Sequence, residues 1–138
     1  MSELRRTYKP NGKFTIENLE VEVADSGNSV STIITVSENI SAGNVVNNDG
    51  SKANSATTGK RNKAIGVAGA AIASGFSGTV TTDGILQYGG WAWVAGDILY
   101  LNGTALSTIS PGTGFSQRIG VAIASDKIDV EIGEALLL

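Results

Sequence analysis

The candidates for acid–base chemistry in this chain are its 13 aspartates and glutamates, because histidine and cysteine are both absent. Without imidazole or thiolate, zinc sites built from Cys and His, disulfide bonds and the common nucleophile–base pairs are excluded. Two suitably spaced carboxylates could still hydrolyse a glycosidic bond. Two candidate pairs, Glu20 with Glu22 and Asp129 with Glu131, lie on the polar face of alternating strands. Solubility alone explains acidic residues at such positions.

Other catalytic and ligand-binding motifs do not occur. The chain contains no Asp-x-Asp-x-Asp-Gly calcium loop and no Ser-x-x-Lys pair. The run Gly66-Val67-Ala68-Gly69 is not followed by Gly-Lys-[Ser/Thr], so it is not a phosphate-binding loop. We therefore predict a protein that is not an enzyme and has no cofactor, metal or small-molecule substrate.

Composition narrows the classes of partner. The chain has 138 residues, 18 glycines, 17% charged residues and a formal net charge of −3. This length is typical of one domain, and the negative charge argues against nucleic acid as a partner. The most apolar stretch, residues 64–73, is interrupted by Gly66 and Gly69, so no membrane span is expected. The first 20 residues lack the apolar stretch of a secretory signal, so synthesis in the cytoplasm is expected.

A repeated string organises the chain. Ile-Gly-Val-Ala occurs at residues 65–68 and again at 119–122, each time a similar distance after an Ala-Gly turn that opens an apolar strand. Two copies of such a unit indicate a duplicated β-module rather than a solenoid, which needs at least about three. We place the first module at about residues 40–86 and the second at 93–138.

The rest of the pattern also favours strands. Residues 13–23 are expected to form a strand, since Glu20 and Glu22 alternate with apolar residues over 19–23, and residues 128–132 alternate in the same way. Residues 29–36 are uncharged and rich in β-branched residues, which also favours a strand. Asn102-Gly103 predicts a tight hairpin turn, and Asn48-Asp49-Gly50 predicts another. The expected fold is all-β, a compact barrel or sandwich formed by one domain at residues 14–138, preceded by an extended N-terminal arm at residues 1–13.

The arm carries basic residues at Arg5, Arg6 and Lys9, together with Tyr8. One interpretation is a solvated terminus, and the other is an arm that orders on an acidic neighbouring surface through charge-assisted hydrogen bonds. A second basic cluster, at residues 60–63, is interpreted either as a solvated loop or as a contact with an acidic partner.

Two apolar groups are candidates for contacts between proteins. Trp91 and Trp93 lie two residues apart, so both would face the same side of a strand. Together with Tyr88 they could form core, a sugar-stacking platform or a subunit interface. The chain ends at Leu136, Leu137 and Leu138, which we expect to dock in a sheet against their own core or a neighbouring subunit.

Several strings follow a pattern of an Ala-Gly-Asp-hydrophobic turn, a strand ending in Asp-Gly-Ile-Leu and a final Ile-Gly-Val-Ala strand. They are Ile40-Ser-Ala-Gly-Asn-Val-Val, Ile65-Gly-Val-Ala, Thr79-Val-Thr-Thr-Asp-Gly-Ile-Leu, Trp93-Val-Ala-Gly-Asp-Ile-Leu-Tyr-Leu and Ile119-Gly-Val-Ala-Ile-Ala-Ser. In these strings the chain resembles a family of small capsid decoration (cement) proteins of tailed bacteriophages. The resemblance spans about residues 40–132 and does not cover residues 1–39.

The resemblance implies a virion structural protein, seated on the outside of the capsid as a homotrimer and bound to the major capsid protein. It would stabilise the shell by bridging capsid subunits. We expect Arg5, Arg6, Tyr8 and Lys9 to contact the capsid. The subunit interface is expected at Trp91, Trp93 and residues 136–138. One alternative is a head-fibre or tail-spike module for receptor or glycan binding. The other is a depolymerase-like enzyme, and the scattered carboxylates are the only feature in its favour.

Overall fold

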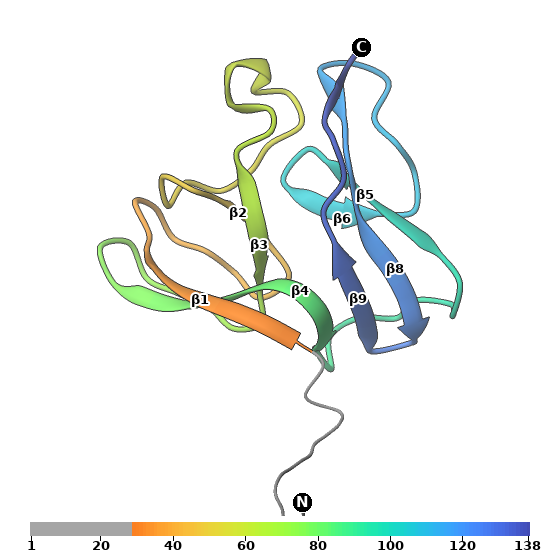
Figure 1. Cartoon of the computed structure of the whole chain (residues 1–138), viewed down its shortest axis with the longest axis horizontal. Helices are drawn as coiled ribbons and strands as arrows, with labels where there is room; N and C mark the ends of the chain where they lie inside the picture. Colours follow the sequence, from red (N-terminus) through yellow and green to blue (C-terminus); the bar gives the residue numbers. More distant parts are fainter. Residues whose placement is uncertain (1–28) are drawn as a thin grey trace, which may run out of the picture.

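The computed structural model describes residues 29–138, and within them the predicted all-β fold is confirmed (Figure 1). The only helical element in this part of the chain is a single 3-10 turn, η1 (Thr58–Lys60). The strands are β1 (Ser29–Thr35), β2 (Val45–Asn47), β3 (Ala64–Ala68), β4 (Ser77–Gln87), β5 (Ile98–Asn102), β6 (Ala105–Ser107), β7 (Phe115–Ser116), β8 (Arg118–Ala124), β9 (Lys127–Glu131) and β10 (Leu136–Leu137).

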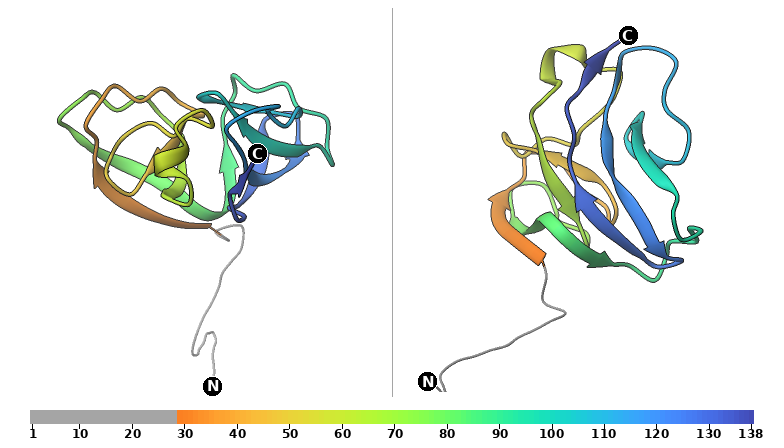
Figure 2. Two further views of the ribbon diagram at one scale, coloured as in Figure 1. Left: turned by 90° about the horizontal axis from the view of Figure 1, so that it is seen from above. Right: turned by 45° about the vertical axis from the view of Figure 1, so that its right-hand side comes forward.

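The strands form one curled antiparallel sheet in the order β2-β3-β4-β9-β8-β5-β6, and β1 pairs with β4. A second, short sheet pairs β10 with β7. Seen from above, the molecule has two lobes with β4 between them (Figure 2). The lobes correspond to the two predicted modules.

Strand β4 belongs to both lobes. It pairs with β3 at Val80 and Thr81 and with β9 from Asp83 to Gln87. Strand β1 pairs with β4 over the whole stretch from Ser77 to Gly84, so it lies on the edge opposite to β3 and β9. One long strand therefore supplies backbone hydrogen bonds to both halves of the fold.

The two modules share a hydrogen-bonding register. The β2–β3 pair and the β5–β8 pair are each interrupted by a bulge at the same position. The equivalent pairs are Val45↔Val67 with Ile98↔Val121, Val46↔Gly66 with Leu99↔Gly120, and Asn47↔Ala64 with Tyr100↔Arg118.

The turns that open β2 and β5 are also equivalent. Ser41 donates its N–H to Asn44 Oδ1 at 2.8 Å, and Val94 donates its N–H to Asp97 Oδ2 at 3.0 Å. The glycine before each of these side chains has a positive φ, +89° in the first turn and +98° in the second. An amide and a carboxylate thus perform the same role, since each side chain accepts the backbone N–H of the residue three positions before it.

The apolar interior is divided into two clusters. The larger one draws residues from both modules: Val45, Ala53, Val67, Leu99, Leu101, Phe115, Ile119, Ile128, Val130 and Ala135. The smaller one lies within the first module: Val36, Ile40, Val46, Ala68, Ile72 and Val80. The inner face of the second module therefore packs on one face of the first, and the first module closes its other face with its own chain.

Strand β1 lies at the border of the sheet. Its seven residues include no charge, and all but Ile34 are exposed, with Val30 60% and Ile33 74% accessible. Within residues 29–138 it pairs only with β4. Its other edge therefore offers backbone groups that no strand of the described chain takes up.

The glycine of each Ile-Gly-Val-Ala string allows a close approach between strands. A Cβ atom on Gly66 would lie 2.5 Å from the carbonyl oxygen of Thr81, and one on Gly120 would collide with the carbonyl of Asp129. We predict that Gly66→Ala and Gly120→Ala each lower the free energy of unfolding by about 1–3 kcal/mol, as overpacking does. Urea unfolding would measure both. Gly59→Ala is the control, because nothing lies within 4 Å of its Cβ position.

Asp49 ties the loop after β2 to the basic loop at residues 60–63. Its Oδ1 accepts hydrogen bonds from the Ser51 N–H at 3.0 Å and the Ser51 hydroxyl at 2.5 Å, and its Oδ2 lies 2.8 Å from Lys60 Nζ. These bonds, from Lys60 first and then Ser51, hold the pKa of Asp49 well below its usual range.

We predict that Asp49→Asn lowers the free energy of unfolding at pH 7 by less than about 1 kcal/mol, because both partners are more than a third exposed. The folded-state pKa is depressed, so the charge stabilises the fold above about pH 4 and this gain declines as the pH falls further. The difference between wild type and Asp49→Asn should therefore be smaller at pH 3 than at pH 7 in urea unfolding. A difference that does not change with pH would contradict this assignment.

Candidate interaction surfaces

The predicted capsid-contacting residues Arg5, Arg6, Tyr8 and Lys9 lie outside the described residues, as do Glu20 and Glu22. Their role stays a prediction. The described chain begins with β1 at Ser29, the border strand of the sheet (Figure 1).

Trp91 and Trp93 do not lie in a strand, so the strand-based argument for their shared direction is wrong. Residues 88–97 form turns and extended backbone between β4 and β5. The aromatic side chains nevertheless gather: the ring centroids of Tyr88 and Trp91 are 5.5 Å apart, edge to face, and those of Trp91 and Trp93 are 6.2 Å apart. Trp91 and Trp93 therefore lie close together because of a turn, and not because they alternate along a strand.

Both indoles are half buried against the larger core cluster. The indole of Trp91 packs on the turn before β2, since a Cβ on Gly43 would lie 3.2 Å from Trp91 Nε1. The Nε1 atom of Trp93 is buried without a hydrogen-bond partner in the described structure. A surface hollow of about 210 Å³ lies beside the three rings, with Asn44 and Leu106 in its wall. The aromatic group therefore packs on the core and leaves a small opening.

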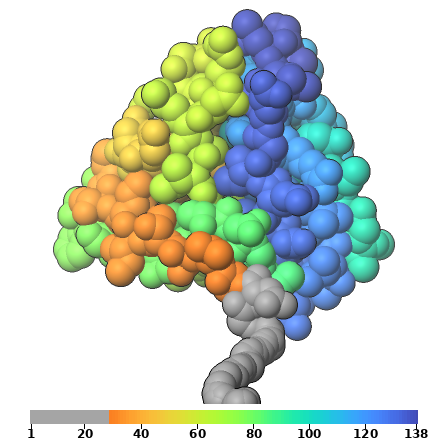
Figure 3. Space-filling view, viewed as in Figure 1, coloured from red at the N-terminus to blue at the C-terminus, as the bar shows by residue number. Residues whose placement is uncertain are grey.

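The three C-terminal leucines are docked in a sheet, as predicted, but not against the core of their own chain. Leu136 and Leu137 pair with Ser116 and Phe115, and the Leu138 N–H donates to the Gly114 carbonyl at 2.9 Å. Their side chains remain 58–60% exposed. The C-terminal segment runs over the surface to one apex of the molecule (Figure 3). The backbone thus holds these leucines in place while their apolar surface faces outwards.

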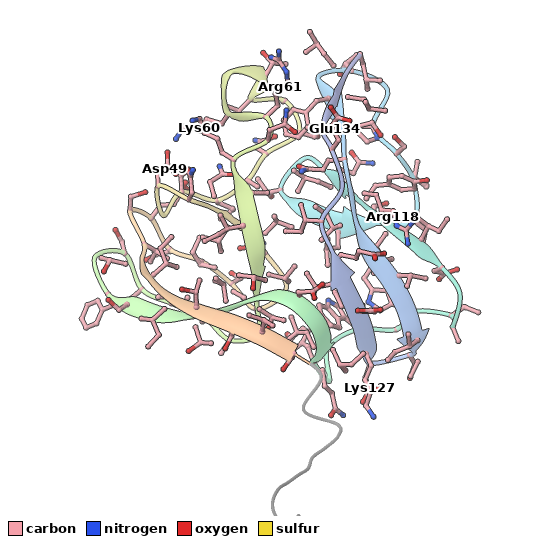
Figure 4. The ribbon with its side chains drawn as sticks, viewed as in Figure 1. Asp49, Lys60, Arg61, Arg118, Lys127 and Glu134 are labelled. Carbon is pink, nitrogen blue, oxygen red and sulfur yellow. The ribbon has the colours of Figure 1, made fainter. Side chains whose placement is uncertain are left out.

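The basic loop lies near the same end of the molecule. Arg61 and Lys63 are exposed, whereas Lys60 turns towards Asp49 (Figure 4). Asn62, at φ 65°, accepts a hydrogen bond from the Ala135 N–H through its Oδ1 at 2.8 Å. The loop is therefore fixed to the C-terminal segment and presents two cationic side chains.

An apolar surface that the sequence analysis missed covers one side of the second module. Ile98 is 43% exposed, Ile123 is 45% exposed and Val94 is 70% exposed. Residues 98–101 and 119–123 are apolar at almost every position, rather than at every second one. Strands of that kind are typically covered on both faces. This departure from alternation indicates that both sides of these strands are apolar, but it does not indicate which side stays uncovered.

A further apolar hollow lies in the first module. It has a volume of about 460 Å³ and is lined by small residues of the β3–β4 connection, such as Ala70 and Ala73, and by Phe76 and Leu86. Phe76 is 68% exposed. Apolar surface is thus open on both modules.

The carboxylates form no catalytic arrangement that we can identify in residues 29–138. Asp129 and Glu131 lie on the solvent side of β9, and Glu131 Oε1 is 3.5 Å from Arg118 Nη2. No group of three or more acidic side chains in this range is arranged to hold a metal ion. No helix in the described part of the chain has the length and apolarity needed to cross a membrane.

Comparison with known proteins gives one family. A model of the family described as phage cement protein matches residues 24–133, which is most of the chain and includes both modules. No curated protein and no solved structure matches the chain. This family has a structural role at the bacteriophage capsid, in agreement with the resemblance found in the sequence. The chain belongs to the phage cement protein family.

Proposed function

We propose that this protein binds the outside of a bacteriophage capsid and stabilises the shell by bridging capsid subunits. Its membership of the phage cement family carries the proposal. A β-rich body with exposed apolar side chains on several surfaces supports it, because such surfaces bind other proteins.

The proposed partner is the major capsid protein, and the proposed state is a homotrimer. A shell that encloses packed DNA fails where its subunits separate. A trimer that touches several subunits makes linked contacts, and linkage can raise the apparent affinity by about 10²–10⁴-fold over one contact. The protein would be made in the host cytoplasm and reside on the capsid surface.

Two segments would provide the contacts. The basic arm, with Arg5, Arg6, Tyr8 and Lys9, would reach across the capsid surface and form charge-assisted hydrogen bonds with acidic side chains. The C-terminal leucines would form part of the proposed subunit interface, because their side chains are exposed. Trp91 and Trp93, half buried on the core, would contribute by their exposed edges.

Deletion of residues 2–12 should weaken binding to purified empty capsids by at least about tenfold, because it removes the arm's charged contacts. Co-sedimentation with empty capsids measures this. Arg5→Ala combined with Arg6→Ala should reproduce much of the loss and weaken its dependence on salt.

The matched control is Arg61→Ala combined with Lys63→Ala, which removes the same charge from the exposed loop of the folded body. Its capsid binding should stay close to that of wild type. If the loop variant loses binding and the arm variant keeps it, the basic loop rather than the arm makes the contact.

A glycan-binding head-fibre or tail-spike module is the second candidate function. The observation in its favour is the hollow beside Tyr88, Trp91 and Trp93, since aromatic rings at a surface opening can stack on sugars. The packing of both indoles on the core favours a structural role instead.

We expect that added oligosaccharides leave the tryptophan fluorescence unchanged and that Trp91→Ala lowers the free energy of unfolding by about 2 kcal/mol, since half of a large core contact is lost. Ile109→Ala, at a side chain that is 68% exposed, is the control and should change the stability by no more than about 0.5 kcal/mol. A saturable fluorescence change with an oligosaccharide would instead support the glycan-binding function.

A further inference from the structure

The second module presents a sheet face that nothing in the described chain covers. We call it the outer face of β5, β8 and β9. Leu99, Ile128 and Val130 point to the opposite side, where they are fully buried. The side chains that alternate with them form the outer face: Ile98, Tyr100, Arg118, Val121, Ile123, Lys127, Asp129 and Glu131.

The apolar part of this outer face is continuous. Ile98 is the register partner of Val121. Ile123 follows at the bulge of β8 between Ala122 and Ala124, where its side chain is 45% exposed. Val94 extends the patch, because its turn is bonded to β8 through the Gly96 N–H and the carbonyl of the residue before Ile123, at 2.7 Å. Charged side chains of β8 and β9 border this apolar strip on one side.

The first module shows what happens to the equivalent face. By register, Val45 corresponds to Ile98, Val67 to Val121 and Thr81 to Asp129. Val45 and Val67 are fully buried, and Thr81 is 8% exposed. Val45 and Val67 are buried because the inner face of the second module packs on them. The same kind of face is thus an interface in one repeat and uncovered in the other.

A simple continuation of this packing from one copy to the next is blocked. In such a continuation, the outer face of one copy's second module would pack on the inner face of another copy's first module. That inner face consists of Val46, Ala68 and Val80. Those side chains are already covered by Ile40 and Ile72 of their own chain. Among the corresponding sheet faces of the two modules, the one that stays uncovered in another copy is the outer face itself.

The charges of the outer face suit contact between identical faces. Arg118 and Lys127 provide two positive charges, and Asp129 and Glu131 provide two negative charges, so two such faces carry no net charge against each other. An apolar centre with a charged border is also the usual composition of protein interfaces. Around a symmetry axis, a patch meets its own copies.

We infer that the outer face of β5, β8 and β9 is a self-association surface, at which the same faces of several copies of this chain meet around a symmetry axis. The inference deepens the proposed function, on whose homo-oligomer it rests, and it adds a second interface to the C-terminal leucines.

Sedimentation velocity over a range of concentrations tests the inference on the full chain. Wild type should sediment above its monomer mass of 14.1 kDa. Ile123→Lys, which places a charge in the centre of the patch, should require at least about tenfold higher concentration to associate. Ile109→Lys is the matched control, because Ile109 is 68% exposed and lies outside the outer face. It should associate like wild type.

A cross-linking measurement provides a second readout. The chain has no cysteine, so Ile123→Cys creates a unique thiol. Mild oxidation should link two copies through this position if identical faces meet, and Ile109→Cys should not be linked. A monomeric wild type, or equal association of wild type and both lysine variants, would overturn the inference.

Capsid binding is measured separately, so that a failure of the proposed function can be distinguished from a failure of the self-association surface. If wild type self-associates but does not bind empty capsids, the proposed function fails and the self-association surface stands. If wild type is monomeric and Ile123→Lys abolishes capsid binding, the outer face docks on the shell and the inference of a second copy is wrong.

Discussion

Both halves of this protein depend on the backbone hydrogen bonds of one strand. Strand β4 pairs with β1 along one edge and with β3 and then β9 along the other, so neither module has a complete sheet without it. Gly84, at φ +89°, lies where β4 passes from the first module to the second. This arrangement makes the two repeats a single body, and the larger core cluster, which takes residues from both, fixes their relative position.

The shared strand also decides which apolar faces are left over. The second module uses its inner face to cover the first, so the first module is packed on both sides, while the second keeps one side open. The C-terminal leucines and Phe76 add exposed apolar surface at other places on the fold. A rigid body with apolar surface in several directions suits a protein whose proposed role is to hold other proteins together, because contacts from a preformed surface cost little conformational entropy.

Much of the fold could be predicted from the sequence, because repetition and turn chemistry are local. The two Ile-Gly-Val-Ala strings predicted equivalent strands, and Asn102-Gly103 predicted the β5–β6 hairpin. The aromatic group was predicted for the wrong reason, since Trp91 and Trp93 come together through a turn and not through strand alternation. The outer face could not be predicted, because the periodicity of Ile98 and Ile123 shows that both sides of a strand are apolar but not which side the rest of the chain will cover. The residues of the basic arm lie outside the described structure, so their part of the candidate site rests on composition alone.

The uncharged border strand has a consequence for how the protein behaves away from its partners. Most natural sheets end in a strand with lysine, proline or a protective bulge, which prevents endless stacking of one molecule on the next. Strand β1 has no charged residue and carries exposed Val30 and Ile33. Its pairing with β4 is irregular between Val30 and Ser31, and no strand of residues 29–138 covers its other edge, so that edge can accept backbone hydrogen bonds from another chain. Copies fixed at separate lattice points of a larger particle could not meet edge to edge in this way.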